Sequence, residues 1–151
     1  MESIRIIEYQ EEYNSQVKNL LYSTLRYVGL QNDCSKPTRD ADLDKIGDVY
    51  RGRGRFWLAI KDDKVVGMVA ILEVDNVTAK LKRMFVIPDY HGTGLGQKLL
   101  NTAFKFAKEH RYSKIVLDTH EIMTRAQRFY EKNGFHKVKE EDATFFYERD
   151  L

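Results

Sequence analysis

The sequence has a single cysteine and lacks the features that would place it in several specialised classes of protein. Cys34 has no partner within the chain, which excludes an internal disulfide and a cysteine-based zinc cluster. No apolar run approaches the roughly 20 residues that a membrane-spanning helix needs. The first residues also lack the apolar core of a signal peptide. We therefore expect a cytoplasmic protein with no membrane partner.

Strong charge of one sign and metal-ligand spacing are missing as well. The formal net charge of +2 is too small to indicate a nucleic-acid partner. His91, His110, His120 and His136 show none of the spacings typical of metal ligands, so we expect no metal. The sequence contains no repeat and no linker. Its 151 residues, 42% of them apolar, predict one globular domain over residues 1–151.

The most informative stretch is a glycine loop between an expected strand and an expected helix. Met84–Ile87 is an apolar run that ends at Pro88, as a buried strand does. Three glycines follow within Gly92–Gly96, and apolar residues recur with helical spacing from Leu95 onward. Unpaired N–H groups at a helix N-terminus, approached closely through glycines, predict a phosphate or pyrophosphate site. The alternative is an ordinary turn before a helix.

Hydrophobic periodicity predicts seven strands and four helices. The strands are expected at residues 4–9, 56–61, 65–73, 77–87, 114–118, 135–138 and 143–147, and the helices at 13–28, 40–50, 95–110 and 124–133. Asp40 is the expected cap of the second helix, after a polar loop over Gln31–Thr38. The strand–helix–strand order between Leu81 and Asp118 implies a parallel pair of strands.

The strand at 77–87 changes phase along its length. Val77, Ala79 and Leu81 share one parity, whereas Met84 and Val86 have the other. This change indicates either a β-bulge or a strand that is buried on both faces near its end.

Two phrases of the sequence together resemble the signatures of the GNAT superfamily of N-acetyltransferases. The first is Phe85–Pro88 (FVIP) followed by His91–Gly96 (HGTGLG), similar to the family's acyl-CoA loop, Q/R-x-x-G-x-G/A. The second is Arg125–Phe135 (RAQRFYEKNGF), similar to the family's A-x-x-F/L-Y-x-x-x-G-F. One strand separates their helices, as in the family. His91 and Met123 depart from the pattern, because the family usually has Gln or Arg at the first position and often Asn at the second.

This resemblance implies a fold and a co-substrate. The fold is α/β (α+β type), a mixed, mostly antiparallel central sheet of about seven strands with about four helices. The family resemblance also favours the bulge, which opens a cleft beside the strand. Acetyl-CoA is the implied co-substrate, with its diphosphate on the loop amides. The implied cofactor-binding residues are Met84, Phe85, Val86, His91, Gly92, Thr93, Gly94, Leu95, Gly96 and Gln97.

Tyr130 is the residue that the resemblance assigns to the chemistry. A phenol with a pKa of about 10 stays protonated at neutral pH and can protonate the CoA thiolate that leaves. From the sequence alone, Tyr130 is equally well an aromatic side chain packed beside Phe129. The resemblance implies that the backbone of Met84–Val86 supplies N–H donors for the oxyanion.

A base is needed to neutralise the attacking amine, and the sequence offers several candidates. Glu73 and Asp75 follow the expected strand 65–73, and His120 follows the strand 114–118. An equally good interpretation is that both carboxylates are simply exposed residues of a turn. Cys34 is unsuited to be a covalent relay because no positive partner lies near it in sequence.

The expected activity is acetyl transfer from acetyl-CoA to a primary amine by direct attack, with a small-molecule or peptide acceptor. The alternative is a non-catalytic acyl-CoA-binding regulatory module on the same fold. Arg51–Arg55 (RGRGR) is either a basic loop that meets an acidic ligand or, more simply, a solvated connector. Homodimers are common in the family, and the sequence decides neither the oligomeric state nor the acceptor.

Overall fold

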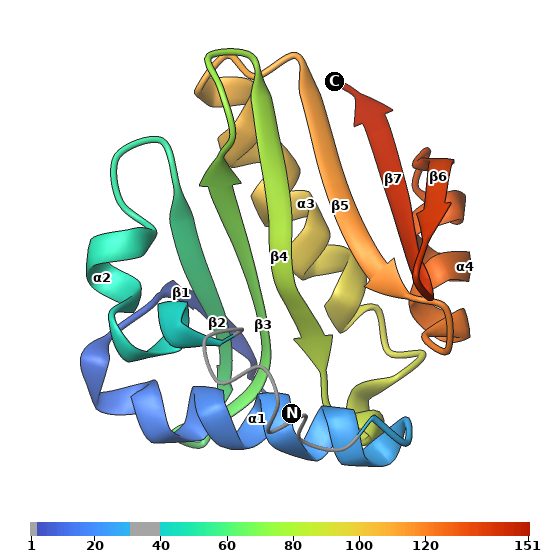
Figure 1. Cartoon of the computed structure of the whole chain (residues 1–151). Helices are drawn as coiled ribbons and strands as arrows, with labels where there is room; N and C mark the ends of the chain where they lie inside the picture. The colour runs from blue at the N-terminus through green and yellow to red at the C-terminus, as the bar shows by residue number, and fades with distance from the viewer. Residues whose placement is uncertain (1–2, 31–39) are drawn as a thin grey trace.

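The computed structural model describes residues 3–30 and 40–151, which form a seven-stranded sheet with helices on both faces (Figure 1). The strands are β1 (Arg5–Glu8), β2 (Arg55–Lys61), β3 (Lys64–Glu73), β4 (Thr78–Val86), β5 (Lys114–His120), β6 (His136–Glu141) and β7 (Thr144–Asp150). Their order in the sheet is β1-β2-β3-β4-β5-β7-β6. Neighbours are antiparallel except β4 and β5, which are parallel. The predicted mixed, mostly antiparallel sheet is confirmed.

Helices cover the two faces of the sheet unequally. They are α1 (Asn14–Tyr27), α2 (Ile46–Val49), α3 (Leu95–Glu109) and α4 (Thr124–Lys132), with short 3-10 turns η1 (Glu11–Tyr13), η2 (Ala41–Asp44) and η3 (Pro88–Tyr90). In Figure 1, α1 and α2 lie in front of the sheet and α3 behind it. Each face has its own buried apolar cluster, which includes Leu99 and Leu100 on the α3 side and Val17 and Leu43 on the α1 side. No described helix covers the front of β5, β7 and β6.

The second helix differs from the prediction of one helix over residues 40–50. Lys45, with φ −152°, separates η2 from the single turn of α2. Asp40 makes no capping hydrogen bond, because its carboxylate instead lies 2.9 Å from the guanidinium of Arg83. The predicted apolar side is buried, since Leu43 and Ile46 both belong to the α1-side core. The predicted loop over Gln31–Thr38, Cys34 included, lies outside the described residues.

The basic segment Arg51–Arg55 is a connector whose arginines bind other parts of the chain. Arg53 forms an ion pair with Glu73 (2.7 Å), and its guanidinium lies 4.0 Å from the ring centre of Tyr112. Arg55 pairs with Glu8 at 3.2 Å. Because these contacts use two of the three arginines, the structure favours the solvated connector over a ligand-binding loop.

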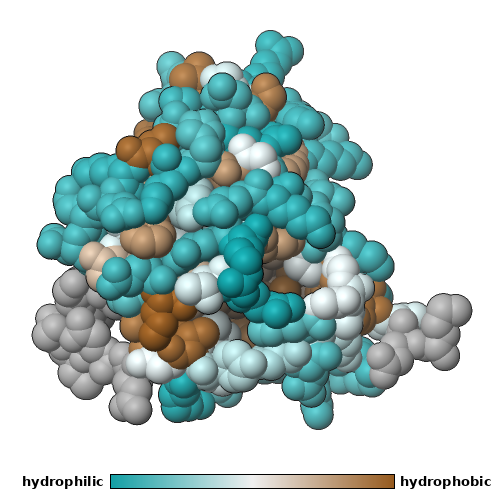
Figure 2. All heavy atoms as spheres, turned by 90° about the vertical axis from the view of Figure 1, so that its right-hand side faces the viewer, coloured by the Kyte–Doolittle hydropathy of each residue, from teal (hydrophilic) through white to brown (hydrophobic). Residues whose placement is uncertain are grey.

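The outer face formed by β6 and α4 is largely hydrophilic (Figure 2). All six residues of β6 are exposed, and Lys137 and Lys139 pair with Glu140 and Glu141. Over residues 3–30 and 40–151, no helix is long and apolar enough to cross a membrane.

β4 contains the predicted bulge. Met68 of β3 pairs with Phe85, but Ala70 pairs with Lys82, so β4 has one more residue than β3 between these pairs. Arg83 lies at this point with φ +56°, a left-handed conformation that is uncommon outside glycine. The change of phase in the sequence therefore marks a bulge and not a strand that is simply buried on both faces.

β4 and β5 separate after only three paired residues. Thr78, Ala79 and Lys80 pair with Lys114, Ile115 and Val116, and no register continues beyond them, although both strands run on. The edge of β4 from Leu81 to Val86 therefore has no strand partner on the β5 side. This parting creates the space for the site described below.

Arg83 fixes the bulge to η2 through a nearly buried ion pair. Its Nε and Nη2 atoms donate to the two oxygens of Asp42 at 3.2 and 2.6 Å, and the Tyr50 hydroxyl donates to the same carboxylate at 2.5 Å. The side chains of Arg83 and Asp42 are only 10% and 12% exposed. Burial alone would raise the pKa of Asp42, but the hydrogen bonds and charge of Arg83, with the bond from Tyr50, outweigh burial and hold it below 3.8.

We expect Asp42→Asn to destabilise the fold at neutral pH by about 2 kcal/mol, because it removes the charge from a charged hydrogen-bonded pair. Because the pKa of Asp42 is lower in the folded than in the unfolded protein, its ionised form stabilises the fold at any pH above the unfolded-state pKa. That stabilisation is lost as the pH falls through the pKa of the folded state. The difference between variant and wild type should therefore shrink below about pH 4, near the ordinary pKa of an aspartate.

Urea unfolding at pH 7 and pH 3 measures this effect. Asp44→Asn in the same turn is the control, because the Asp44 side chain is 68% exposed where it pairs with Lys18, and exposed pairs contribute little. Equal destabilisation by both variants would contradict the assigned role of Asp42.

Candidate active site

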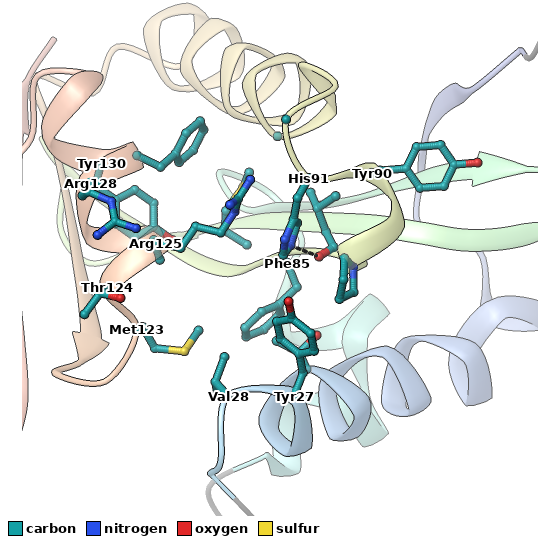
Figure 3. Close-up of a pocket in the computed structure, with 18 of the residues that line it drawn as sticks. Tyr27, Val28, Phe85, Tyr90, His91, Met123, Thr124, Arg125, Arg128 and Tyr130 are labelled. Carbon is teal, nitrogen blue, oxygen red and sulfur yellow. Dashed lines mark hydrogen bonds between the residues drawn. The ribbon is translucent and has the colours of Figure 1, made fainter.

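A cavity of about 730 Å³ opens where β4 and β5 part. The end of α1, the end of β4 with its glycine loop, the β5–α4 connection and α4 itself line this cavity. In Figure 3, Tyr27 and Val28 lie at the bottom of the view, Met123 and Arg125 at the left, and His91 above Tyr27. The cavity therefore connects the predicted phosphate loop with the helix that carries Tyr130.

Most of the predicted cofactor-binding residues line this cavity. They are Met84, Phe85, Val86, His91, Gly92, Gly94, Gly96 and Gln97. Thr93 and Leu95 do not line it. Leu95 is buried in the α3-side core, and the Thr93 hydroxyl donates to the carbonyl of Tyr90 at 2.6 Å. These two residues therefore support the loop on the side away from the cavity.

The glycine loop presents backbone N–H groups that have no acceptor. Gly92 and Gly94 have φ of +76° and +89°, which glycine adopts without strain. Within the described residues, the N–H groups of Gly92, Gly94, Gly96 and Gln97 make no hydrogen bond. These donors lie at the positive end of the α3 dipole, so the loop is suited to bind an anion.

Three cations of α4 face the same cavity. Arg125, Arg128 and Lys132 line it, and none of them has an ion pair or hydrogen bond with the described part of the chain. Together with the loop amides they surround the cavity with unsatisfied donors and positive charge. Their spacing along one face of a helix was visible in the sequence, but only the fold shows that this face turns toward the loop.

His91 stands at the first position of the loop, where the family usually has Gln or Arg. Its Nε2 donates to the carbonyl of Val86 at 3.1 Å, and the ring of Tyr27 meets it edge to face at 6.2 Å. The side chain therefore ties the loop to the end of β4 and to α1. Met123 stands where the family often has asparagine, and it places an apolar side chain in the cavity wall.

Tyr130 combines a buried ring with a free hydroxyl. The ring packs against Phe129, Phe135 and Tyr147, and the residue is only 7% exposed. The hydroxyl makes no hydrogen bond with the described residues, and the side chain lines the cavity. Burial, and then the negative charge of Asp118, raise the pKa of Tyr130 above 10. The phenol is thus held in its protonated form.

The structure does not bring the predicted carboxylate bases to the cavity. Glu73 lies opposite Ala79, at the other end of β3 from the cavity, about 20 Å away along the strand. Its carboxylate pairs with Arg53. Asp75 accepts the N–H groups of Val77 and Thr78, so it is an exposed turn carboxylate.

His120 and Asp118 lie nearer to the cavity. The Nδ1 atom of His120 accepts the N–H of Ile122, and Ile122 lines the cavity. Asp118, which the sequence analysis did not identify, lies two residues past Val116, the last residue of β5 that pairs with β4, and its carboxylate is 2.8 Å from Lys80. A charged residue at the end of the apolar run KIVLD was the available signal. Among the described residues, no three His, Cys, Asp or Glu side chains gather as a metal site would require.

Comparison with known proteins relates this arrangement to one family. Residues 16–135 match the family model described as "Acetyltransferase (GNAT) family". An acetyltransferase structure of the GNAT family from Staphylococcus aureus Mu50 is 31% identical and has a TM-score of 0.89, with 99% of each chain covered. The PaiA N-acetyltransferase of Thermoplasma acidophilum, solved in complex with coenzyme A, is 23% identical with a TM-score of 0.83 over 99% of each chain and shares the fold.

Curated relatives include longer proteins. The N-acetylaspartate synthetase of Xenopus tropicalis is 41% identical over 108 residues, which are 70% of this chain and 39% of that protein. The chain spans half or less of the length of the curated relatives that it matches. With the parted parallel strands, the glycine loop and the family model agreeing, the chain belongs to the GNAT family of acetyltransferases.

Proposed function

We propose that this chain transfers an acetyl group from acetyl-CoA to a primary amine of a small molecule or peptide, by direct attack. The observation that carries the proposal is the free hydroxyl of Tyr130, which lies in the same cavity as the unsatisfied amides and cations. A general acid can protonate the leaving thiolate, and an anion-binding loop can hold the diphosphate of CoA.

In this proposal the diphosphate of CoA accepts hydrogen bonds from the amides of Gly92, Gly94 and Gly96. Arg125, Arg128 and Lys132 balance the remaining phosphate charge from α4. The acyl arm then runs between α4 and the end of β4 toward Tyr130. The family neighbour solved with coenzyme A supports this choice of co-substrate.

The reaction proceeds at the parting of β4 and β5. The amine nitrogen attacks the thioester carbonyl, and the unpaired edge of β4 at Met84–Val86 offers N–H donors to the oxyanion. The carbon–sulfur bond then breaks, the Tyr130 hydroxyl protonates the CoA thiolate, and the nitrogen loses its extra proton. Glu73 has no part in this proposal, and His120 is the predicted base that remains near the cavity.

Titration calorimetry with acetyl-CoA, followed by a thiol-release assay with an amine panel, tests the proposal. We expect stoichiometric binding and release of free thiol with at least one class of amine. One relative is named for making N-acetylaspartate, so free amino acids belong in the panel. Binding without any thiol release would indicate the regulatory acyl-CoA-binding module instead.

A further inference from the structure

Charged side chains gather at the parting of β4 and β5, on the sheet face opposite α3, and the proposed mechanism leaves them unused. Ala79 and Leu81 point into the α3-side core, so Lys80 and Lys82 point to the other face. Asp118 lies on that face as well, since its carboxylate is 2.8 Å from the Lys80 ammonium. This is the face that no described helix covers over β5 (Figure 1).

Lys82 is the cation of this group that has no partner. Lys80 pairs with Asp118, and Arg83 pairs with both Asp40 and Asp42. Within residues 3–30 and 40–151, the Lys82 ammonium makes neither a hydrogen bond nor an ion pair, although the residue is half-buried. A half-buried ammonium without a hydrogen-bond partner loses hydration that no direct contact replaces. An anionic ligand would remove that cost.

Two carboxylates act on the charge of Lys82, Asp42 on η2 and Asp118 on β5. They and the neighbouring cations Lys80 and Arg83 act on its charge, while burial is the largest influence and lowers the pKa of Lys82. Asp42 is fully engaged by Arg83 and Tyr50. Arg83 therefore already neutralises the Asp42 carboxylate, and the Lys82 ammonium can still bind another anion.

Asp118 offers the complementary group. Its Oδ2 contacts Lys80, and its other oxygen has no partner in the described part of the chain. It lies just past the last pair of β4 and β5, where the strands part, and its negative charge also acts on Tyr130. A free carboxylate oxygen there can accept a hydrogen bond from an amine that approaches the thioester.

We propose that this pair selects a zwitterionic acceptor, a free amino acid, whose carboxylate binds Lys82 and whose amino group is held by Asp118. The inference rests on the proposed function and names the acceptor class of the same site. In the transfer, the amino nitrogen forms the bond to the acetyl carbon, the carbon–sulfur bond breaks, and Tyr130 protonates the thiolate. The ammonium of the zwitterion gives one proton to solvent before the attack, and the nitrogen gives up a second one after the carbon–nitrogen bond forms. Tyr130 regains its proton from solvent.

Matched acceptor pairs test this inference directly. Steady-state kinetics would compare L-alanine with ethylamine, L-phenylalanine with 2-phenylethylamine and L-lysine with 1,5-diaminopentane, which differ only in the carboxyl group. For the preferred amino acid we expect kcat/KM at least 10-fold above that of its partner. Lys82→Met should raise KM for the amino acid about 10- to 100-fold, because one charged hydrogen bond is lost. KM for the carboxyl-free amine and the Kd of acetyl-CoA should change less than about 2-fold.

Two further variants separate specificity from folding. Lys82→Arg keeps the charge and should retain most of the preference. Lys114→Met removes a lysine from the same sheet face where β4 and β5 are still paired, and it should leave the preference unchanged. Turnover without discrimination between paired acceptors, or an equal rise in KM for both, would overturn the inference alone. Failure of thiol release with every acceptor would overturn the proposed function and this inference with it.

Discussion

Tyr130→Phe is expected to lower kcat at least 100-fold while the Kd for acetyl-CoA stays within about 2-fold. General acid catalysis by one positioned group contributes about 10²- to 10⁴-fold, and the variant removes only the proton donor. The ring contacts with Phe129, Phe135 and Tyr147 remain, so the site keeps its shape. Steady-state kinetics with calorimetry separates the two constants.

The pH profile adds a second check on Tyr130. Because burial and Asp118 raise its pKa above 10, the phenol should stay protonated across the neutral and mildly alkaline range. The wild-type kcat should therefore show no loss from this group below pH 10. Tyr112→Phe is the control, since Tyr112 is equally buried but its hydroxyl donates to the carbonyl of Arg53, away from the cavity. An unchanged kcat in Tyr130→Phe would remove this tyrosine from the mechanism.

Gly94→Val is expected to weaken acetyl-CoA binding about 100-fold. Gly94 has φ +89°, and a β-branched residue does not adopt this conformation without strain. The loop should relax and carry its free N–H groups away from the diphosphate. Each charged hydrogen bond contributes about 1.5 to 3 kcal/mol, so losing two of them would raise the Kd by more than about 100-fold. A partial displacement of the loop is therefore enough to produce the expected effect. Calorimetric titration with acetyl-CoA measures the Kd.

Gly52→Val provides a matched control for backbone strain. Gly52 also has a positive φ, +63°, and a Cβ atom at either glycine would meet no atom within 4 Å. Both variants should therefore lose a similar unfolding free energy, about 1 to 2 kcal/mol, whereas only Gly94→Val should change the Kd. Undiminished affinity in Gly94→Val would mean that the nucleotide does not use the loop amides.

The geometry of the glycine loop could be predicted from the sequence because it is local. Gly92–Gly96 supply both the backbone conformation and the free amides within one short segment, directly before the helix whose dipole they share. The bulge at Arg83 was also local, because one inserted residue reverses the alternation of buried side chains. In both cases the pattern and the structure depend on neighbouring residues.

The residues that we propose for the acceptor could not be predicted from the sequence, because they come from distant segments. Glu73 is a carboxylate at the end of a strand, as the reading required, but the antiparallel register places it at the far end of β3 from the cavity. Asp118 and Lys82 come from different strands and lie on one side of the sheet because β4 and β5 are adjacent and part beyond Lys80. Lys82 has no sequence signature of its own, and Asp118 is marked only as a charged residue at the end of the apolar run KIVLD.

The sequence by itself determined the order of the strands, the three long helices, the glycine loop and the membership of the family. Periodicity and turn chemistry act within a few residues, and the sequence states them directly. The tertiary structure alone decided that Asp40 binds Arg83 instead of capping a helix, that the arginines of α4 face the loop, and which charges remain unpaired. These outcomes depend on the register of the strands and on which of several distant charged side chains form ion pairs with one another. A pattern of neighbouring residues in the sequence does not contain this information.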